Sequence, residues 1–278
     1  MRINVCGTRG STPAPGREFV RYGGHTSCPA ITPDAAAVPE LLLDAGTRIR
    51  EVTRLPAGAP FLGPIALTHL HWDHVPGLPF FAGGDKDGAR VRLLMPAPDG
   101  GGTAEAALER GMSPPHLPIT PRQLRGDWEF AGIEPGLDLA GPLTPLAREI
   151  PHKGGRTFGY RVSDGTHDIA CPPDHCPTDL GAGPAGLGVY HDAALELAGA
   201  DILMHDSFWY AEDFDPARTF GHSAAEYAIG LAAHAGARRV LLHHKPDRTD
   251  TELEKLAAGL QDSPGPVTLA ADGEVIML

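Results

Sequence analysis

The chain has few basic residues for its length of 278 residues. Lys and Arg together number 23, against 35 Asp and Glu, so the formal net charge is −12 at pH 7. Nucleic-acid polymers and anionic membranes are held mainly by Lys and Arg that neutralise phosphates. The composition therefore argues against both as partners, and a small-molecule substrate is the expectation.

Paired cysteines and long apolar runs are missing as well. The four cysteines contain no C-x-x-C pair, which favours free thiols in a reducing compartment. No apolar run reaches the roughly 20 residues that span a membrane. The first residues also lack the apolar segment of a secretory signal. These absences predict a cytoplasmic protein with no membrane partner.

Apolar residues make up 42% of the chain, which is enough for a folded core, and short apolar strands alternate with amphipathic helices. No repeat of fixed period and no linker interrupts this alternation, so we predict one α/β domain over residues 1–278. Residues 126–171 are predicted to form a run of antiparallel strands. Ser223 and Glu226 predict a capping box at a helix start. Strands are expected at 2–7, 40–46, 63–68, 90–96, 127–133, 143–150, 157–162, 167–171, 201–206, 238–244, 267–271 and 274–278, and helices at 47–55, 103–112, 189–200, 223–236 and 251–260.

Three histidines and one aspartate lie close together in THLHWDH, residues 68–74, directly after an apolar strand. Imidazole and carboxylate groups are costly to bury unless something satisfies them. Histidine suits Zn, Fe, Ni and Cu, while carboxylate adds charge that suits harder ions. Four such groups exceed what one open catalytic ion takes from a single segment, so the motif predicts a site for two ions. The alternative is a histidine-rich surface turn that binds nothing. The four residues are His69, His71, Asp73 and His74.

The motif is one of several that follow each other in a recognisable order: LLLDAG, THLHWDH, the isolated His152, CPPDHCP around Asp174, GHSAAEYA and VLLHHKP. This order, over nearly the whole chain, resembles the metallo-β-lactamase-fold superfamily, and most of all its branch of ribonuclease Z and small phosphodiesterases. The resemblance implies a four-layer αββα sandwich. The metal site would lie at one edge, where loops of the two sheets meet.

The resemblance also implies a ligand set for two divalent ions, with Zn favoured and Mn or Fe as alternatives. The histidines at 243 and 244 alternate across a strand end and should point in opposite directions, and the motif spacing favours His243. His152 could instead be a surface residue, and Asp174 a turn residue after two prolines. The implied set is His69, His71 and His152 for one ion, Asp73, His74 and His243 for the other, Asp174 bridging both, and Asp44 orienting ligands through hydrogen bonds.

His222 in GHSAAEYA is expected to act on the substrate. In the resembling branch the equivalent histidine contacts the substrate or transition state, and an acidic residue upstream supports it. Asp206, at the end of the predicted strand 201–206, offers that support, because an Asp–His pair fixes the tautomer and keeps the imidazole ready to donate a proton. Asp73, Asp206 and His222 are therefore the predicted catalytic residues. The alternative for His222 is a helix cap.

The predicted function is hydrolysis of a small phosphodiester, linear or cyclic. Two ions about 3.5–4 Å apart can deprotonate a bridging water at neutral pH, and the hydroxide would displace the leaving group in line. A transfer-RNA substrate would need an extended Lys/Arg-rich arm, which the sequence lacks. The same hydroxide could instead attack a lactone, thioester or amide. Two further alternatives are an iron-dependent redox enzyme and a metal-binding protein without catalysis, and a homodimer is left open.

Overall fold

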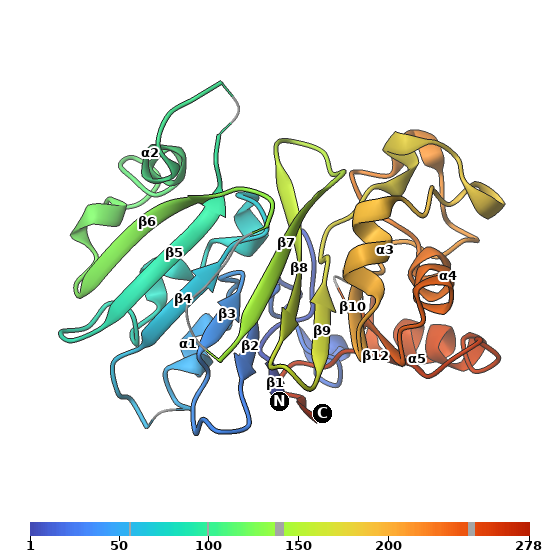
Figure 1. Cartoon of the computed structure of the whole chain (residues 1–278), viewed down its shortest axis with the longest axis horizontal. Coiled ribbons are helices and arrows are strands. Elements are labelled where there is room, and N and C mark those ends of the chain that lie inside the picture. The colour runs from blue at the N-terminus through green and yellow to red at the C-terminus, as the bar shows by residue number, and fades with distance from the viewer. Residues whose placement is uncertain (56, 99, 137–141, 244–247) are drawn as a thin grey trace.

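The computed structural model describes residues 1–278 except 56, 99, 137–141 and 244–247. Its strands form two sheets that face each other (Figure 1). The strands are β1 (Arg2–Val5), β2 (Pro29–Thr32), β3 (Leu41–Leu43), β4 (Leu62–Ala66), β5 (Arg90–Pro96), β6 (Asp127–Ile133), β7 (Thr144–Ile150), β8 (Thr157–Ser163), β9 (Asp168–Cys171), β10 (Ile202–Asp206), β11 (Arg239–His243), β12 (Val267–Leu269) and β13 (Val275–Met277). One sheet has the order β13-β1-β2-β3-β4-β5-β6, and the other has the order β12-β11-β10-β9-β8-β7.

Each sheet combines antiparallel and parallel pairs. In the first sheet β13, β1, β2 and β3 pair antiparallel, and β3 to β6 pair parallel. In the second sheet β7, β8 and β9 pair antiparallel, and β9 to β12 pair parallel. The antiparallel prediction for residues 126–171 is therefore confirmed for β7 to β9 and wrong for β6. A parallel return needs a long crossover, and the segment between β5 and β6 is long enough to supply one.

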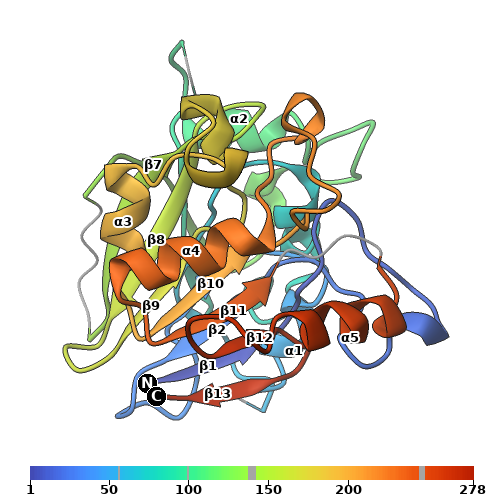
Figure 2. The ribbon, with the colours of Figure 1, turned by 90° about the vertical axis from the view of Figure 1, so that its right-hand side faces the viewer.

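Helices cover the outer face of each sheet, so the chain forms four layers. The helices are α1 (Ile49–Val52), α2 (Ala104–Glu109), α3 (Asp192–Ala198), α4 (Ala225–Ala235) and α5 (Asp250–Gly259). One buried cluster lies between the sheets, a second joins the first sheet to α1 and α2, and a third joins the second sheet to α3, α4 and α5. Figure 2 shows the last three helices on the outside of the second sheet. The predicted αββα sandwich is confirmed.

Two buried hydrogen bonds tie the sheets together at the start of the THLHWDH motif. The Tyr160 hydroxyl on β8 donates to the carbonyl oxygen of Leu67 at 2.8 Å. The amide of Phe158, also on β8, donates to the carbonyl oxygen of Thr68 at 2.9 Å. Both carbonyls come just after β4, so the second sheet fixes the start of the THLHWDH turn.

The start of α4 differs from the prediction. Its N-cap residue is Ala224, and no side chain caps it, so the predicted Ser223–Glu226 capping box is wrong. The Ser223 amide donates to Asp206 Oδ2 at 3.1 Å, and its hydroxyl donates to the Asp206 carbonyl oxygen at 3.3 Å. A buried carboxylate requires hydrogen-bond donors. Ser223 donates to Asp206 and therefore does not cap the helix.

The ends of strands from both sheets meet at one edge. Asp44 follows β3, the THLHWDH turn follows β4, His152 follows β7, and Asp174 follows β9. In sheets with parallel strands, ligands bind outside the carboxyl ends of the strands, which is where these residues lie. No helix in the described part of the chain has the length and apolar character needed to cross a membrane.

Candidate metal centre

The THLHWDH turn places its polar side chains inward and Trp72 outward. Its second half is a short 3-10 turn, Trp72–His74. His69, Asp73 and His74 are buried, whereas Trp72 is 76% exposed. The alternation of polar and apolar residues therefore separates an inner, polar side of the turn from an outer, apolar side.

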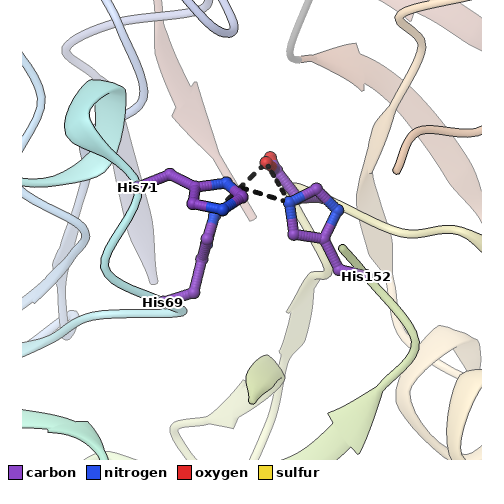
Figure 3. A group of neighbouring side chains, drawn as sticks. His69, His71 and His152 are labelled. Atoms are coloured by element: carbon purple, nitrogen blue, oxygen red, sulfur yellow. Dashed lines mark hydrogen bonds and ion pairs between the residues drawn. The ribbon is translucent and has the colours of Figure 1, made fainter. Parts of the chain in front are cut away.

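A first group of metal-capable side chains combines the two sheets. Its members each offer one atom, and these atoms all lie within 4.8 Å of one another. His71 Nδ1 lies 3.1 Å from His152 Nε2. Figure 3 shows the rings of His69 and His71 pointing toward the ring of His152, which comes from the opposite side. The members are His69, His71, His152 and Asp174.

A second group shares Asp174 with the first. It consists of Asp73, His74 and Asp174. His74 Nε2 lies 3.2 Å from Asp73 Oδ2 and 3.3 Å from Asp174 Oδ1. The other oxygen, Asp174 Oδ2, lies 3.4 Å from Nε2 of His69. The two oxygens of one buried carboxylate therefore face different groups.

Three of the rings are oriented by hydrogen bonds from the nitrogen that faces away from Asp174. His152 Nδ1 donates to the carbonyl oxygen of Gly221 at 2.6 Å. His69 Nδ1 lies 3.0 Å from Thr68 Oγ1, and His74 Nδ1 lies 2.7 Å from an oxygen of Asp44. Each bond leaves Nε2 directed into the centre. Such outer bonds fix the tautomer and orientation of a metal-ligating histidine.

Asp44 holds the first-sheet side of the centre. It is fully buried and accepts hydrogen bonds from the Thr68 amide at 2.8 Å, the Thr68 hydroxyl at 2.9 Å and the Ser27 hydroxyl at 3.2 Å, besides its contact with His74. Its φ of 58° is left-handed, a conformation that Asp tolerates better than most residues. The carboxylate is thus saturated with partners and can serve only to orient them.

Burial lowers the pKa of every histidine in the centre, and nearby carboxylates reverse this effect at His74. It lowers the pKa of His69 and of His152 to about 4 and lowers that of His71 as well, so these rings are neutral at pH 7. Burial also opposes a proton on His74, but the three carboxylates around that ring raise its pKa well above the usual value. The centre therefore combines neutral imidazoles with a strongly negative field.

This donor set fits divalent metal ions. Neutral imidazole nitrogen and carboxylate oxygen are the ligands of Zn, Mn and Fe sites in proteins. The field that favours positive charge on His74 would equally favour a cation beside Asp174. Gly154 leaves space for the set, because a Cβ at this residue would lie 2.6 Å from His71 Nε2.

His222 and Asp206 lie beside the first group. His222 Nδ1 is 3.1 Å from Asp206 Oδ2, and its ring centroid is 5.3 Å from that of His152. Burial opposes a proton on His222, but Asp206 raises its pKa above the usual value. Asp206 also accepts from the amides of His175 and Phe208 at 3.2 and 2.9 Å. His222 does not cap α4, whose N-cap is Ala224.

His243 stands apart from the two groups described above in its known contact. Its ring is buried at the end of β11, with Nε2 2.9 Å from the carbonyl oxygen of Gly7. Neither metal-capable group in the described residues around the site includes it. His244 lies outside the described residues. The ligand role of His243 therefore stays a prediction.

Sequence reasoning did not identify Thr68 or Gly221, which orient His69 and His152. Thr68 immediately precedes the metal motif and its hydroxyl reaches both Asp44 and His69, so its position was a usable signal. Gly221 acts through its backbone carbonyl, and a Cβ at this position would lie 2.7 Å from His152 Nδ1. The glycine was therefore the one available signal, although it does not by itself name the partner of the carbonyl.

Two facing sheets with shared His/Asp groups at their strand ends are the arrangement of the metallo-β-lactamase fold, and similarity to hydrolases of this fold makes the chain a metal-dependent hydrolase. The model of the beta-lactamase superfamily domain matches residues 39–245. The chain belongs to this superfamily.

Relatives and solved structures agree with that assignment. Ribonuclease Z of Limosilactobacillus fermentum is 28% identical over 220 residues, which cover 65% of this chain and 68% of that protein. The metallo-β-lactamase fold protein YhfI of Bacillus subtilis has a TM-score of 0.69 at 21% identity and covers 99% of this chain and 98% of its own. A diphosphatase of the PhnP family has a TM-score of 0.66 at 20% identity and covers 100% and 97%.

Proposed function

We propose that the chain is a phosphodiesterase that uses two divalent metal ions, Zn in the first place, to hydrolyse a small phosphodiester. The observation that carries this proposal is the shared carboxylate of Asp174, whose two oxygens face two groups of ligands. One ion would be held by His69, His71 and His152, the other by Asp73 and His74, with Asp174 between them. The predicted seventh ligand is His243.

Ions bound in this way would activate water and neutralise charge on the phosphoryl oxygens. The residues of the chain determine how the substrate meets them. Thr68, Asp44 and Gly221 hold the ligand rings in fixed orientations, so little reorganisation is needed during the reaction. Ser11 donates its amide to Asp73 Oδ2 at 2.7 Å and thereby restrains this predicted ligand.

His222 is proposed to donate a proton to the leaving oxygen. Its Nδ1 is engaged by Asp206, so its Nε2 is the atom that can face the substrate. The ring stacks on Phe208 with centroids 4.5 Å apart and an interplanar angle of 8°, which fixes its plane. General acid catalysis by such a residue contributes about 10²–10⁴-fold.

A small ester is favoured over a nucleic-acid polymer because of charge. A chain with a net charge of −12 repels a polyanion at long range unless a local basic surface compensates. A single phosphodiester carries one negative charge and needs only the metals to hold it. The names of the similar proteins, ribonuclease Z and a diphosphatase, support phosphoryl rather than acyl transfer.

The test is turnover by protein stripped of metal and reloaded with Zn, Mn or, without oxygen, Fe(II). Bis(p-nitrophenyl) phosphate should be hydrolysed in a metal-dependent manner and faster than a lactone or a thioester. The monoester p-nitrophenyl phosphate is the matched control for contaminating phosphatase. If no metal form hydrolyses the diester while one hydrolyses the lactone or thioester, the proposal fails and acyl transfer replaces it.

A further inference from the structure

A tight turn beside the metal centre carries a bulky residue in a left-handed conformation. The amide of His222 donates to the carbonyl oxygen of Thr219 at 3.0 Å and closes the turn. Between them Phe220 has a φ of 52° and Gly221 a φ of 94°. Two successive positive φ values mark a turn that favours Asn, Asp or Gly at its centre. Phenylalanine is an outlier there.

The contact with His152 explains the conformation of Gly221, whereas burial in the core does not explain that of Phe220. A Cβ on Gly221 would lie 2.7 Å from His152 Nδ1, so only glycine lets its carbonyl reach that ring. Phe220 is 64% exposed and contributes little to the core. Strained residues that persist without a packing reason are found mainly at functional sites.

The exposed ring is part of a rigid aromatic surface. Phe220 lies nearly parallel to Trp209, with centroids 6.1 Å apart and an interplanar angle of 19°. Trp209 is itself fixed, since its Nε1 donates to the carbonyl oxygen of Thr219 at 2.9 Å and its amide donates to that of Ser223 at 3.1 Å. The turn therefore exposes the ring of Phe220 to solvent, and the ring of Trp209 packs behind it.

The position of this surface relates it to the chemistry. The residue after Phe220 orients His152 through its carbonyl, and the next residue is His222 itself. Phe220 is thus one residue from the carbonyl that orients the predicted ligand His152 and two residues from the predicted proton donor.

We propose that Phe220, supported by Trp209, is a stacking platform for a flat aromatic ring of the substrate, such as a nucleobase or an aryl group joined to the phosphodiester. This inference rests on the proposed phosphodiesterase function and specifies its substrate class. Stacking of a base on an aromatic side chain is strong enough to change affinity by an order of magnitude, and it needs no particular base.

Binding of two product-like ligands to the zinc-loaded protein tests the platform without requiring turnover. Adenosine 5′-monophosphate and ribose 5-phosphate share their phosphate and sugar and differ in the base. Calorimetry should show that the wild-type protein binds the adenosine compound about tenfold tighter. Phe220→Gly and Phe220→Asn should abolish this preference, and Phe220→Trp should retain it.

Two controls separate recognition from structure. The melting temperature and zinc content of Phe220→Gly should be no lower than those of the wild type, because glycine adopts the observed φ freely. Ala185 is another exposed residue with a positive φ, of 58°. Ala185→Gly relieves that strain at a different place and should leave the base preference intact. A lower melting temperature or zinc content in both the glycine and asparagine variants would show that the ring serves the fold.

The other outcomes also decide the matter. Equal affinity of the two ligands for the wild type, no binding of either, or a preference that survives in Phe220→Gly would overturn the platform. Sedimentation that shows a wild-type dimer and a monomeric Phe220→Gly variant would assign the ring to contact between copies of the chain. A base preference that depends on Phe220 in a protein without phosphodiester turnover would refute the proposed function alone.

Discussion

The two sides of the metal centre are built in different ways. On the first-sheet side the site residues are close in sequence, and buried side chains hold them: Asp44 and Thr68 orient His74 and His69. On the second-sheet side the residues are far apart in sequence, and a backbone carbonyl orients His152.

The difference has a consequence for function. A change at Asp44 or Thr68 directly removes an orienting group from a ligand. A change of the exposed Phe220 side chain can alter this surface while the Gly221 carbonyl still holds His152. Under the proposed function, the first side would hold the metals in place, and the second would determine which substrate is accepted.

The largest effect is expected where the two sides meet. Asp174→Ala removes the carboxylate that belongs to both ligand groups, so bound metal should fall by at least one equivalent and phosphodiester turnover should drop to background. Elemental analysis after dialysis and an assay of the same sample measure both. A variant with two ions and full activity would show that Asp174 is not the shared ligand.

On the second-sheet side, His222→Ala should lower kcat about 10²–10⁴-fold for a poor leaving group while the metals stay bound. The loss should shrink for p-nitrophenolate, which needs little protonation on departure. His234→Ala is the matched control, because this exposed histidine lies on α4 away from the metal groups. Equal losses for poor and good leaving groups would argue against proton donation by His222.

On the first-sheet side, Asp44→Asn should weaken metal binding about 10–100-fold, the usual effect of losing the carboxylate behind a ligating histidine. Titration of the stripped protein with Zn in competition with a chelator measures this. Asp262→Asn, an exposed substitution of the same kind, should leave the affinity unchanged. An Asp44→Asn variant with wild-type affinity would mean that Thr68 and packing alone orient His74.

The smallest effect is expected at His243, which faces the Gly7 carbonyl oxygen. His243→Ala should destabilise the fold by about 1–3 kcal/mol, because it leaves that buried oxygen without this donor. If His243 is the metal ligand that the sequence predicts, metal content should in addition fall in His243→Ala and not in His244→Ala. The reverse pattern would assign the ligand to His244, and unchanged metal content in both would exclude the pair.

Local patterns predicted most strands and helices, and the four-layer arrangement was predicted from the resemblance to the superfamily. Prediction from the sequence failed where a contact between residues far apart in the chain determines the local structure. Parallel pairing of β6 depends on the crossover through α2, and Ser223 leaves its cap position to satisfy Asp206. Neither partner is adjacent in the chain, so no local pattern could reveal them.

The residues of the site also fall into those with a local sequence pattern and those without one. His69, His71, Asp73 and His74 form one dense motif, and the structure brings all four to the metal groups. His152, Asp174 and His222 carry no local pattern of their own and were found through the order of motifs in a resembling superfamily. The contribution of Gly221 and the strain at Phe220 are properties of the backbone, which only the structure reveals.

The number of metal ions needed for turnover tests the central claim most directly. Metal-free protein at a concentration far above the dissociation constants should be titrated with Zn while hydrolysis of bis(p-nitrophenyl) phosphate is followed. The account predicts that activity rises until two equivalents per chain are bound. A plateau at one equivalent, with no further gain from Zn, Mn or Fe(II) as the second ion, would contradict it.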